Sequence, residues 1–178
     1  MLVVVFGCAV PPKSPNSRAL AVEHNFQSWT MKGRMGIQNG YEAWGMSIIW
    51  QQQLDQFTIQ LIAPLGQGTT TLKGTEQLIY ARFPDGKTAV YQNPDQVFTE
   101  AIGVVLPLAS LRYWIFGRVD DRKPAEVTRN AAGQIEEIVQ DGWDISYLSY
   151  SEEFGLPSKI LVENDAVEVK LIIREWAR

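Results

Sequence analysis

Short turns between segments of alternating polarity constrain the fold of this chain more than any other feature of its sequence. Near the C-terminus, the turn Asn164-Asp165 precedes 167–176, where apolar residues alternate with the polar Glu168 and Lys170. A period of two is typical of a β-strand with one buried face. Because such short links join antiparallel neighbours, whereas parallel neighbours need long crossovers, an antiparallel meander is predicted. Further strands are expected at 134–140, 143–150 and 158–163, with turns at Ala132-Gly133, Asp141-Gly142 and Phe154-Gly155.

The first half of the chain carries the same pattern. Apolar residues at 44, 46, 48 and 50 have one parity, so their side chains share a face of one strand. In 57–63 the odd-numbered positions are again apolar, which predicts a second strand that runs into Pro64. Shorter strands are expected at 69–73, 76–82 and 87–91.

Two helices are predicted in the middle of the chain. Asn93 before Pro94 is typical of an N-cap followed by the first helical position, with Gln96 three residues after the cap. A second helix is predicted over 107–116, with Gly117 as its stop. The buried face of the first helix is expected to hold Val97 or Phe98, Ala101, Ile102 and Val105.

A further helix is expected over about 17–28, so that three helices must cover one face of the sheet. The predicted fold class is therefore α+β, a curved antiparallel sheet with helices packed on its concave side. The chain of 178 residues shows no internal repeat, and residues 18–178 are expected to form a single domain.

Charge and composition exclude some classes of function. The formal net charge is −4 and the sequence pI is about 5.1, with Lys and Arg scattered along the chain. Binding to nucleic acid requires a basic face, so no nucleic-acid partner is expected. No apolar run approaches the roughly 18 residues of a membrane-spanning helix.

The single cysteine, Cys8, follows an apolar run that ends in Gly7. This pattern is typical of a bacterial lipoprotein signal, in which cleavage before the cysteine leaves its thiol to carry a diacylglyceryl group. The run is shorter than usual and no Lys or Arg precedes it, which we interpret as a start downstream of the true one. The alternative is a short N-terminal strand. Residues 1–8 are thus expected to be a signal remnant ending in the lipidated Cys8, and the Pro-rich 9–17 a flexible tether.

No catalytic constellation is found. His24 is the only histidine and is interpreted as a solvated helix residue, so no familiar nucleophile–base pair can be assembled. Gly66-x-Gly68 lacks the further residues of a phosphate-binding loop. The pair Asp120-Asp121 is expected to be solvated. The chain is predicted to be a non-enzyme without a cofactor.

Aromatic residues are abundant, with six Trp, six Tyr and seven Phe. They can fill a solid core, or they can line an apolar cavity left by helices that cover the sheet incompletely. Composition alone does not separate these alternatives.

Leu65 stands between Pro64 and Gly66, where the chain leaves its strand and a polar turn residue would be usual. Apolar side chains usually fold back under a turn as core. Against that, Pro64 stiffens the exit and the neighbouring glycines offer no side chains to shelter a leucine. The projecting orientation is favoured once the resemblance described next is considered.

An ordered set of motifs resembles the LolB family of outer-membrane lipoprotein receptors. The set spans the chain downstream of the cysteine. It comprises Cys8, Gly33, Pro64-Leu65-Gly66, Leu106-Pro107-Leu108 with the segment up to Gly117, Gln140-Asp141-Gly142-Trp143, Tyr147, Tyr150, Leu156-Pro157 and Trp176.

This resemblance implies a half-open antiparallel barrel, as in LolA and LolB, lined by apolar and aromatic residues and plugged by helices. It implies a lipid anchor in the inner leaflet of the outer membrane, facing the periplasm. It also implies acceptance of lipoproteins from the periplasmic carrier LolA and delivery of their acyl chains among outer-membrane phospholipids. The loop Pro64, Leu65, Gly66 corresponds to the family's membrane-insertion loop. The expected cavity residues are Trp50, Leu61, Leu108, Trp114 and Trp143.

Three other readings remain open, and a monomer is expected in each. One is a soluble LolA-like carrier with the same cavity and no anchor. Another is a structural envelope lipoprotein that has a solid core and binds a protein partner. An esterase or lipase is disfavoured because no catalytic base is found.

Overall fold

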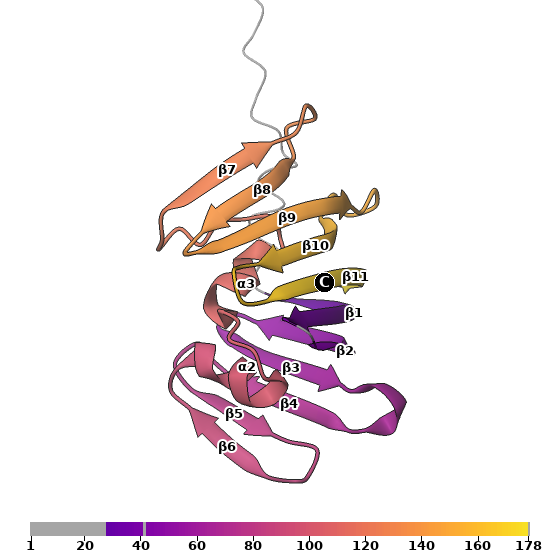
Figure 1. The fold of residues 1–178 in the computed structure, drawn as a ribbon, viewed down its shortest axis with the longest axis vertical. Helices are drawn as coiled ribbons and strands as arrows, with labels where there is room; N and C mark the ends of the chain where they lie inside the picture. The colour runs from indigo at the N-terminus through magenta and orange to yellow at the C-terminus, as the bar shows by residue number, and fades with distance from the viewer. Residues whose placement is uncertain (1–27, 41, 178) are drawn as a thin grey trace, which may run out of the picture.

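The computed structural model describes residues 28–40 and 42–177. Their strands form one open antiparallel sheet in the order β6-β5-β4-β3-β2-β1-β11-β10-β9-β8-β7 (Figure 1). The first six strands are β1 (Ser28–Asn39), β2 (Glu42–Gln53), β3 (Gln56–Ile62), β4 (Thr69–Gly74), β5 (Ile79–Arg82) and β6 (Thr88–Tyr91). The remaining strands are β7 (Ala125–Arg129), β8 (Ile135–Gln140), β9 (Trp143–Tyr150), β10 (Pro157–Glu163) and β11 (Glu168–Ala177).

Sequence neighbours pair throughout the sheet except at its centre, where β1 pairs with β11. Gly33 lies at a register shift in this pairing, and a Cβ there would come within 2.4 Å of the Ile172 carbonyl oxygen. Glycine is therefore required for the two strands to approach at this point. The edge strands of the sheet are β6 and β7.

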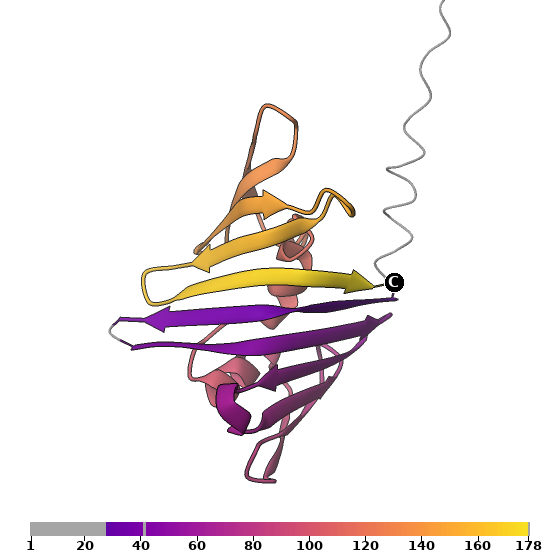
Figure 2. The same cartoon turned by 90° about the vertical axis from the view of Figure 1, so that its right-hand side faces the viewer.

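The chain crosses from one edge strand to the other through two helices, α2 (Pro94–Ile102) and α3 (Leu108–Trp114). Figure 2 shows both helices on the same side of the sheet, which we call the inner face. Because α2 and α3 follow one another between the two edge strands, each covers a different part of the inner face. Two short helices therefore suffice.

The predicted alternation is confirmed in the strands under the helices. Met46, Ile48 and Trp50 of β2 are at most 8% exposed, as are Phe57, Ile59 and Leu61 of β3. These side chains lie on the inner face, and the polar residues between them point to the outer face. The curved antiparallel sheet with helices on one side is thus confirmed.

The predicted cap of α2 is also present. The Asn93 side chain accepts a hydrogen bond from the Asp95 backbone N–H at 3.0 Å, and Pro94 opens the helix. Gly103, with φ of 81°, ends it in the left-handed conformation that glycine adopts most easily. Val105 therefore lies beyond the helix and is 60% exposed, so its expected place on the buried face was wrong.

Two other expectations need correction. The strand β7 was not predicted, and all five of its residues are exposed, so it has no buried face. Ser28 begins β1 instead of ending a helix. The rest of the expected N-terminal helix lies outside the described residues, as do Cys8, His24 and the tether.

Candidate functional site

The Pro64–Gly66 loop lies between β3 and β4 and forms a single 3-10 turn, η2. The Ala63 backbone N–H donates to the Gly68 carbonyl at 3.0 Å, and the Gln67 N–H donates to the Pro64 carbonyl at 3.2 Å. Leu65 itself has φ of 55° and a side chain that is 98% exposed. Of the two orientations considered from the sequence, Leu65 has the projecting one.

A groove of about 560 Å³ opens beside this loop, between the sheet and α2; we call it the loop groove. Apolar residues from both sides form much of its wall, with Leu61 contributed by the sheet and Ile102 by the helix. Its lining residues are Met46, Leu61, Ala63, Gly68, Thr70, Phe83, Pro84, Asp85, Lys87, Glu100, Ala101 and Ile102. Ala63 and Gly68, which stand on either side of the Leu65 loop in the sequence, both line the loop groove.

Charged side chains stand at the rim of the loop groove. Lys87 Nζ lies 2.7 Å from Asp85 Oδ2, and the hydrogen bond to Lys87 lowers the pKa of the Asp85 carboxyl. On the helix side, Tyr91 donates its hydroxyl hydrogen to Glu100. Burial of Tyr91 and the neighbouring Glu100 carboxylate raise the pKa of Tyr91 to about 12. The rim is therefore polar while the floor is apolar, which suits a ligand with an apolar chain and a polar end.

All five expected cavity residues are buried in the core, Leu61 among them at 3% exposure. Trp50, Leu108 and Trp114 are at most 2% exposed, and Trp143 is 7% exposed. The rings of Trp114 and Trp143 lie 6.3 Å apart, in tilted contact. Of the five, Leu61 also lines the loop groove. The role of all five in holding acyl chains stays a prediction.

Asp120 corrects the expectation of a solvated carboxylate pair, because it is fully buried. Its carboxylate accepts hydrogen bonds from Ser110 Oγ at 3.1 Å and from Arg122 Nε at 2.7 Å. Burial alone would raise the pKa of this carboxyl, but the hydrogen bonds and charge of Arg122, with Ser110, hold the pKa below its usual value. The spacing Asp120-x-Arg122 was the available sequence signal.

The contacts of Asp120 extend through Arg122 to the β4–β5 turn. Arg122 Nη1 lies 2.7 Å from Glu76 Oε2, and Arg112 Nη1 lies 2.6 Å from Glu76 Oε1. Glu76 belongs to the β4–β5 turn and Arg112 to α3, so the ion pairs tie that helix to the sheet. We call Glu76, Ser110, Arg112, Asp120 and Arg122 the α3 clasp.

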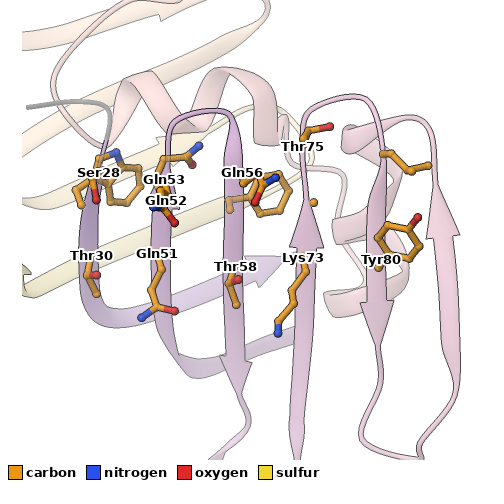
Figure 3. Close-up of a pocket in the computed structure, with 14 residues that line it drawn as sticks. Ser28, Thr30, Gln51, Gln52, Gln53, Gln56, Thr58, Lys73, Thr75 and Tyr80 are labelled. Atoms are coloured by element: carbon orange, nitrogen blue, oxygen red, sulfur yellow. The ribbon is translucent and has the colours of Figure 1, made fainter.

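Another hollow, of about 700 Å³, lies at one end of strands β1 to β5 and is lined largely by outer-face side chains; we call it the outer groove. Figure 3 shows Thr30, Gln51, Thr58, Lys73 and Tyr80 in a row across its strands. These polar side chains make it unsuitable for acyl chains, despite its size. A third hollow of about 590 Å³ lies on the β7–β8 flank and includes Arg129, Gln134 and Asp121 in its wall.

The sequence matches the family model "Outer membrane lipoprotein LolB" over residues 27–176. The chain belongs to the LolB family. The outer-membrane lipoprotein LolB of Thiobacillus denitrificans is 31% identical, covering 96% of this chain and 90% of the relative. The LolB of Nitrosococcus oceani is 29% identical, covering 98% and 92%. Membership confirms the resemblance found in the sequence, and with it the function of an outer-membrane lipoprotein receptor.

Solved structures with much lower sequence identity share this fold. A LolA superfamily protein from Nitrosomonas europaea aligns with a TM-score of 0.55 at 8% identity, over 85% of this chain and 86% of the other. A putative outer membrane lipoprotein-sorting protein domain from Vibrio parahaemolyticus gives 0.57 at 8% identity, over 89% and 90%. At such identity the likeness concerns the fold alone.

The described part of this LolB family member has neither a metal-binding cluster nor a membrane-spanning helix. Residues 28–40 and 42–177 contain no group of three or more His, Cys, Asp or Glu side chains that could hold a metal ion. In the same residues, neither helix is long and apolar enough to cross a membrane.

Proposed function

We propose that this LolB family member accepts the acyl chains of lipoproteins from LolA in the loop groove and delivers them into the inner leaflet of the outer membrane. The observation that carries the proposal is the pairing of a fully projecting Leu65 with an apolar groove that begins two residues upstream, at Ala63. A leucine so placed contributes roughly 1.5–3 kcal/mol on leaving water, enough to orient a loop at a bilayer and too little to anchor a protein.

The size and lining of the loop groove support the first step. Its volume of about 560 Å³ lies within the roughly 300–1,000 Å³ of sites that enclose a small molecule. Acyl chains longer than the groove reach further space only if α2 moves away from the sheet. The apolar residues exposed by such a movement would then be covered by the acyl chains themselves.

The anchor is proposed at Cys8. Two or more acyl chains on this residue give lasting attachment, since each buried CH₂ adds about 0.8 kcal/mol. The tether 9–17 then gives the single domain 18–178 freedom to turn between carrier and membrane. One tethered copy carries both the groove and the loop, so a monomer suffices.

The direction of transfer is proposed to follow from affinity alone, without catalysis or a nucleotide. A receptor that holds acyl chains tighter than the carrier biases transfer tenfold for about each 1.4 kcal/mol. An equilibrium measurement in which the carrier binds acyl chains more tightly would contradict this mechanism.

The proposal is tested by Leu65→Glu. Because Leu65 makes no core contact, the free energy of unfolding should change by less than about 0.5 kcal/mol. Acceptance of a lipoprotein from LolA should persist, whereas its transfer into outer-membrane vesicles should fall at least tenfold. Leu148→Glu is the matched control, since Leu148 is also exposed, at 50%, but lies on the outer face of β9. Equal transfer by Leu65→Glu and the parent protein would overturn the role of the loop.

A further inference from the structure

A second leucine shares the unusual backbone of Leu65. Among the described residues, positive φ outside glycine occurs only at Leu54, Leu65 and Asp141. Asp tolerates the left-handed conformation, whereas a leucine in it is strained. Leu54 has φ of 55°, lies in the two-residue turn between Gln53 and Gln56, and is 60% exposed.

The turn does not need a leucine for its own structure. The buried Gln52 side chain donates its Nε2 hydrogen to the Leu54 carbonyl oxygen at 2.8 Å and accepts from Trp50 Nε1 at 3.3 Å. Both contacts use the Leu54 backbone or its neighbours, so they are independent of the Leu54 side chain. Glycine or asparagine would adopt the same φ at lower cost. An exposed, strained leucine is therefore better explained by a contact outside the domain.

Further exposed residues lie at the same end of the sheet as Leu54, because the β2–β3 and β4–β5 turns are at that end. Leu78, in the β4–β5 turn, is 36% exposed, and Tyr80 is 56% exposed. Tyr80 pairs across the strands with Lys73, and all three line the outer groove (Figure 3). We call Leu54, Lys73, Leu78 and Tyr80 the Leu54 rim. It combines leucines, one amphipathic ring and one cation, which are the side chains that meet a lipid headgroup region.

The place where the N-terminal segment joins the domain indicates what kind of partner contacts the Leu54 rim. Ser28, the first residue described, pairs with Gln53, the residue before Leu54. The 27 preceding residues, with the proposed anchor Cys8, therefore join the domain beside the rim. A domain held by that segment is attached at this end of the sheet.

We propose that the Leu54 rim is a second lipid-contact surface, distinct from the Leu65 loop. The two leucines lie at opposite ends of β3 (Gln56–Ile62), so the rim supplies a contact that the loop cannot. The inference rests on the proposed anchoring at Cys8, which brings the rim to the bilayer. Contact through the rim leaves the loop groove facing away from the membrane, where a soluble carrier approaches.

The experiment measures binding of the unacylated Cys8→Ala protein to vesicles of phosphatidylethanolamine and phosphatidylglycerol by flotation. In this background, Leu54→Asn should lower the partition coefficient about three- to tenfold. Its melting temperature should stay the same or rise, because asparagine relieves the strained backbone. Leu54→Phe should retain binding, and Leu148→Asn, the remote control, should match the parent.

Several outcomes would overturn the inference. One is equal vesicle binding by Leu54→Asn and the parent, and another is equal loss in Leu54→Phe. A concentration-dependent dimer that Leu54→Asn dissociates would show that a second copy occupies the rim instead. No carrier or client is present in this assay, so failure of the transfer mechanism leaves the result unchanged. Acylation of Cys8 is checked separately by mass spectrometry of the protein from its native host.

Discussion

The two helices cover the same sheet face but are held there by different kinds of contact. α3 is tied by directional bonds, since Ser110 and Arg112 belong to the α3 clasp and Trp114 Nε1 donates to Gln140 Oε1 at 2.8 Å. The Tyr147 hydroxyl also donates to the Trp114 carbonyl oxygen, at 2.8 Å. By contrast, α2 rests on the sheet mainly through the buried side chains of Val97, Phe98 and Ile102, and the hydrogen bond from Tyr91 to Glu100 is its one side-chain bond to a strand among those described.

The difference indicates which helix can move. Apolar contacts are not directional, and an acyl chain entering under α2 can replace them with similar ones. Moving α3 would break the hydrogen bonds from Ser110 to Asp120 and from Trp114 to Gln140, at about 1–3 kcal/mol for each buried polar group left without a partner. We therefore expect acyl chains to enter beneath α2, whose residues line the loop groove, while α3 stays fixed.

The largest effect is expected when the α3 clasp is broken. Arg122→Ala leaves the buried Asp120 carboxylate without its main partner and should lower the free energy of unfolding by about 3 kcal/mol at neutral pH. Urea titration measures this, with Arg174→Ala on the exposed side of β11 as a control. A loss no larger than that of the control would show that the clasp does not hold α3.

The difference in stability between the parent and Arg122→Ala is also expected to depend on pH. The pKa of Asp120 is lowered by folding, so its ion pair stabilises the protein fully above the ordinary carboxyl pKa of about 4. That contribution is lost as the pH falls below 4 toward the lowered pKa. The stabilities of the parent and Arg122→Ala should therefore converge in acid.

An intermediate effect is expected from filling the loop groove. Ala101 is a partly buried residue of α2 that lines the groove, so Ala101→Phe should occupy part of its volume. Displacement of a fluorescent fatty acid should report about tenfold weaker binding, with the free energy of unfolding changed by less than about 1 kcal/mol. Ala131→Phe, in an exposed turn, is the matched control. Unchanged affinity would place the acyl site elsewhere.

The smallest effect concerns the α2 cap. Asn93→Ala removes the bond to the Asp95 N–H and should cost about 1 kcal/mol. Amide hydrogen exchange should accelerate in α2 and stay unchanged in α3, whose clasp is intact. Asn164→Ala removes a similar side-chain bond in the β10–β11 turn and should leave α2 exchange unaltered. Equal acceleration in both helices would mean that they move as one unit.

Features that depend on local pattern were predictable from the sequence. Asn93-Pro94 marks the start of α2 because capping uses neighbouring residues alone. The alternation in β2 predicts its buried face for the same reason. β7 was missed because its residues Ala125–Arg129 bury nothing, and its strand conformation depends on pairing with β8.

Features that depend on distant partners were not predictable. Asp120 is buried because Arg122 and Ser110 surround it, and only the fold brings Glu76 to the same place. Trp50 and Leu61 illustrate a related difficulty, since both have the apolar inner-face pattern of a strand. Both are buried in the core, but Leu61 also lines the loop groove, and that difference depends on where α2 and the η2 loop lie.

The pairing of β1 with β11 also governs when this molecule can fold. Ile37 is paired with Val169, so the central seam of the sheet joins the first and last strands of the domain. Such a non-local contact forms slowly, and no local hairpin can substitute for it. Each half of the sheet can form as separate hairpins, but both halves keep an open edge until the last ten residues of β11 have emerged. The sheet is therefore completed only after β11 has been synthesised.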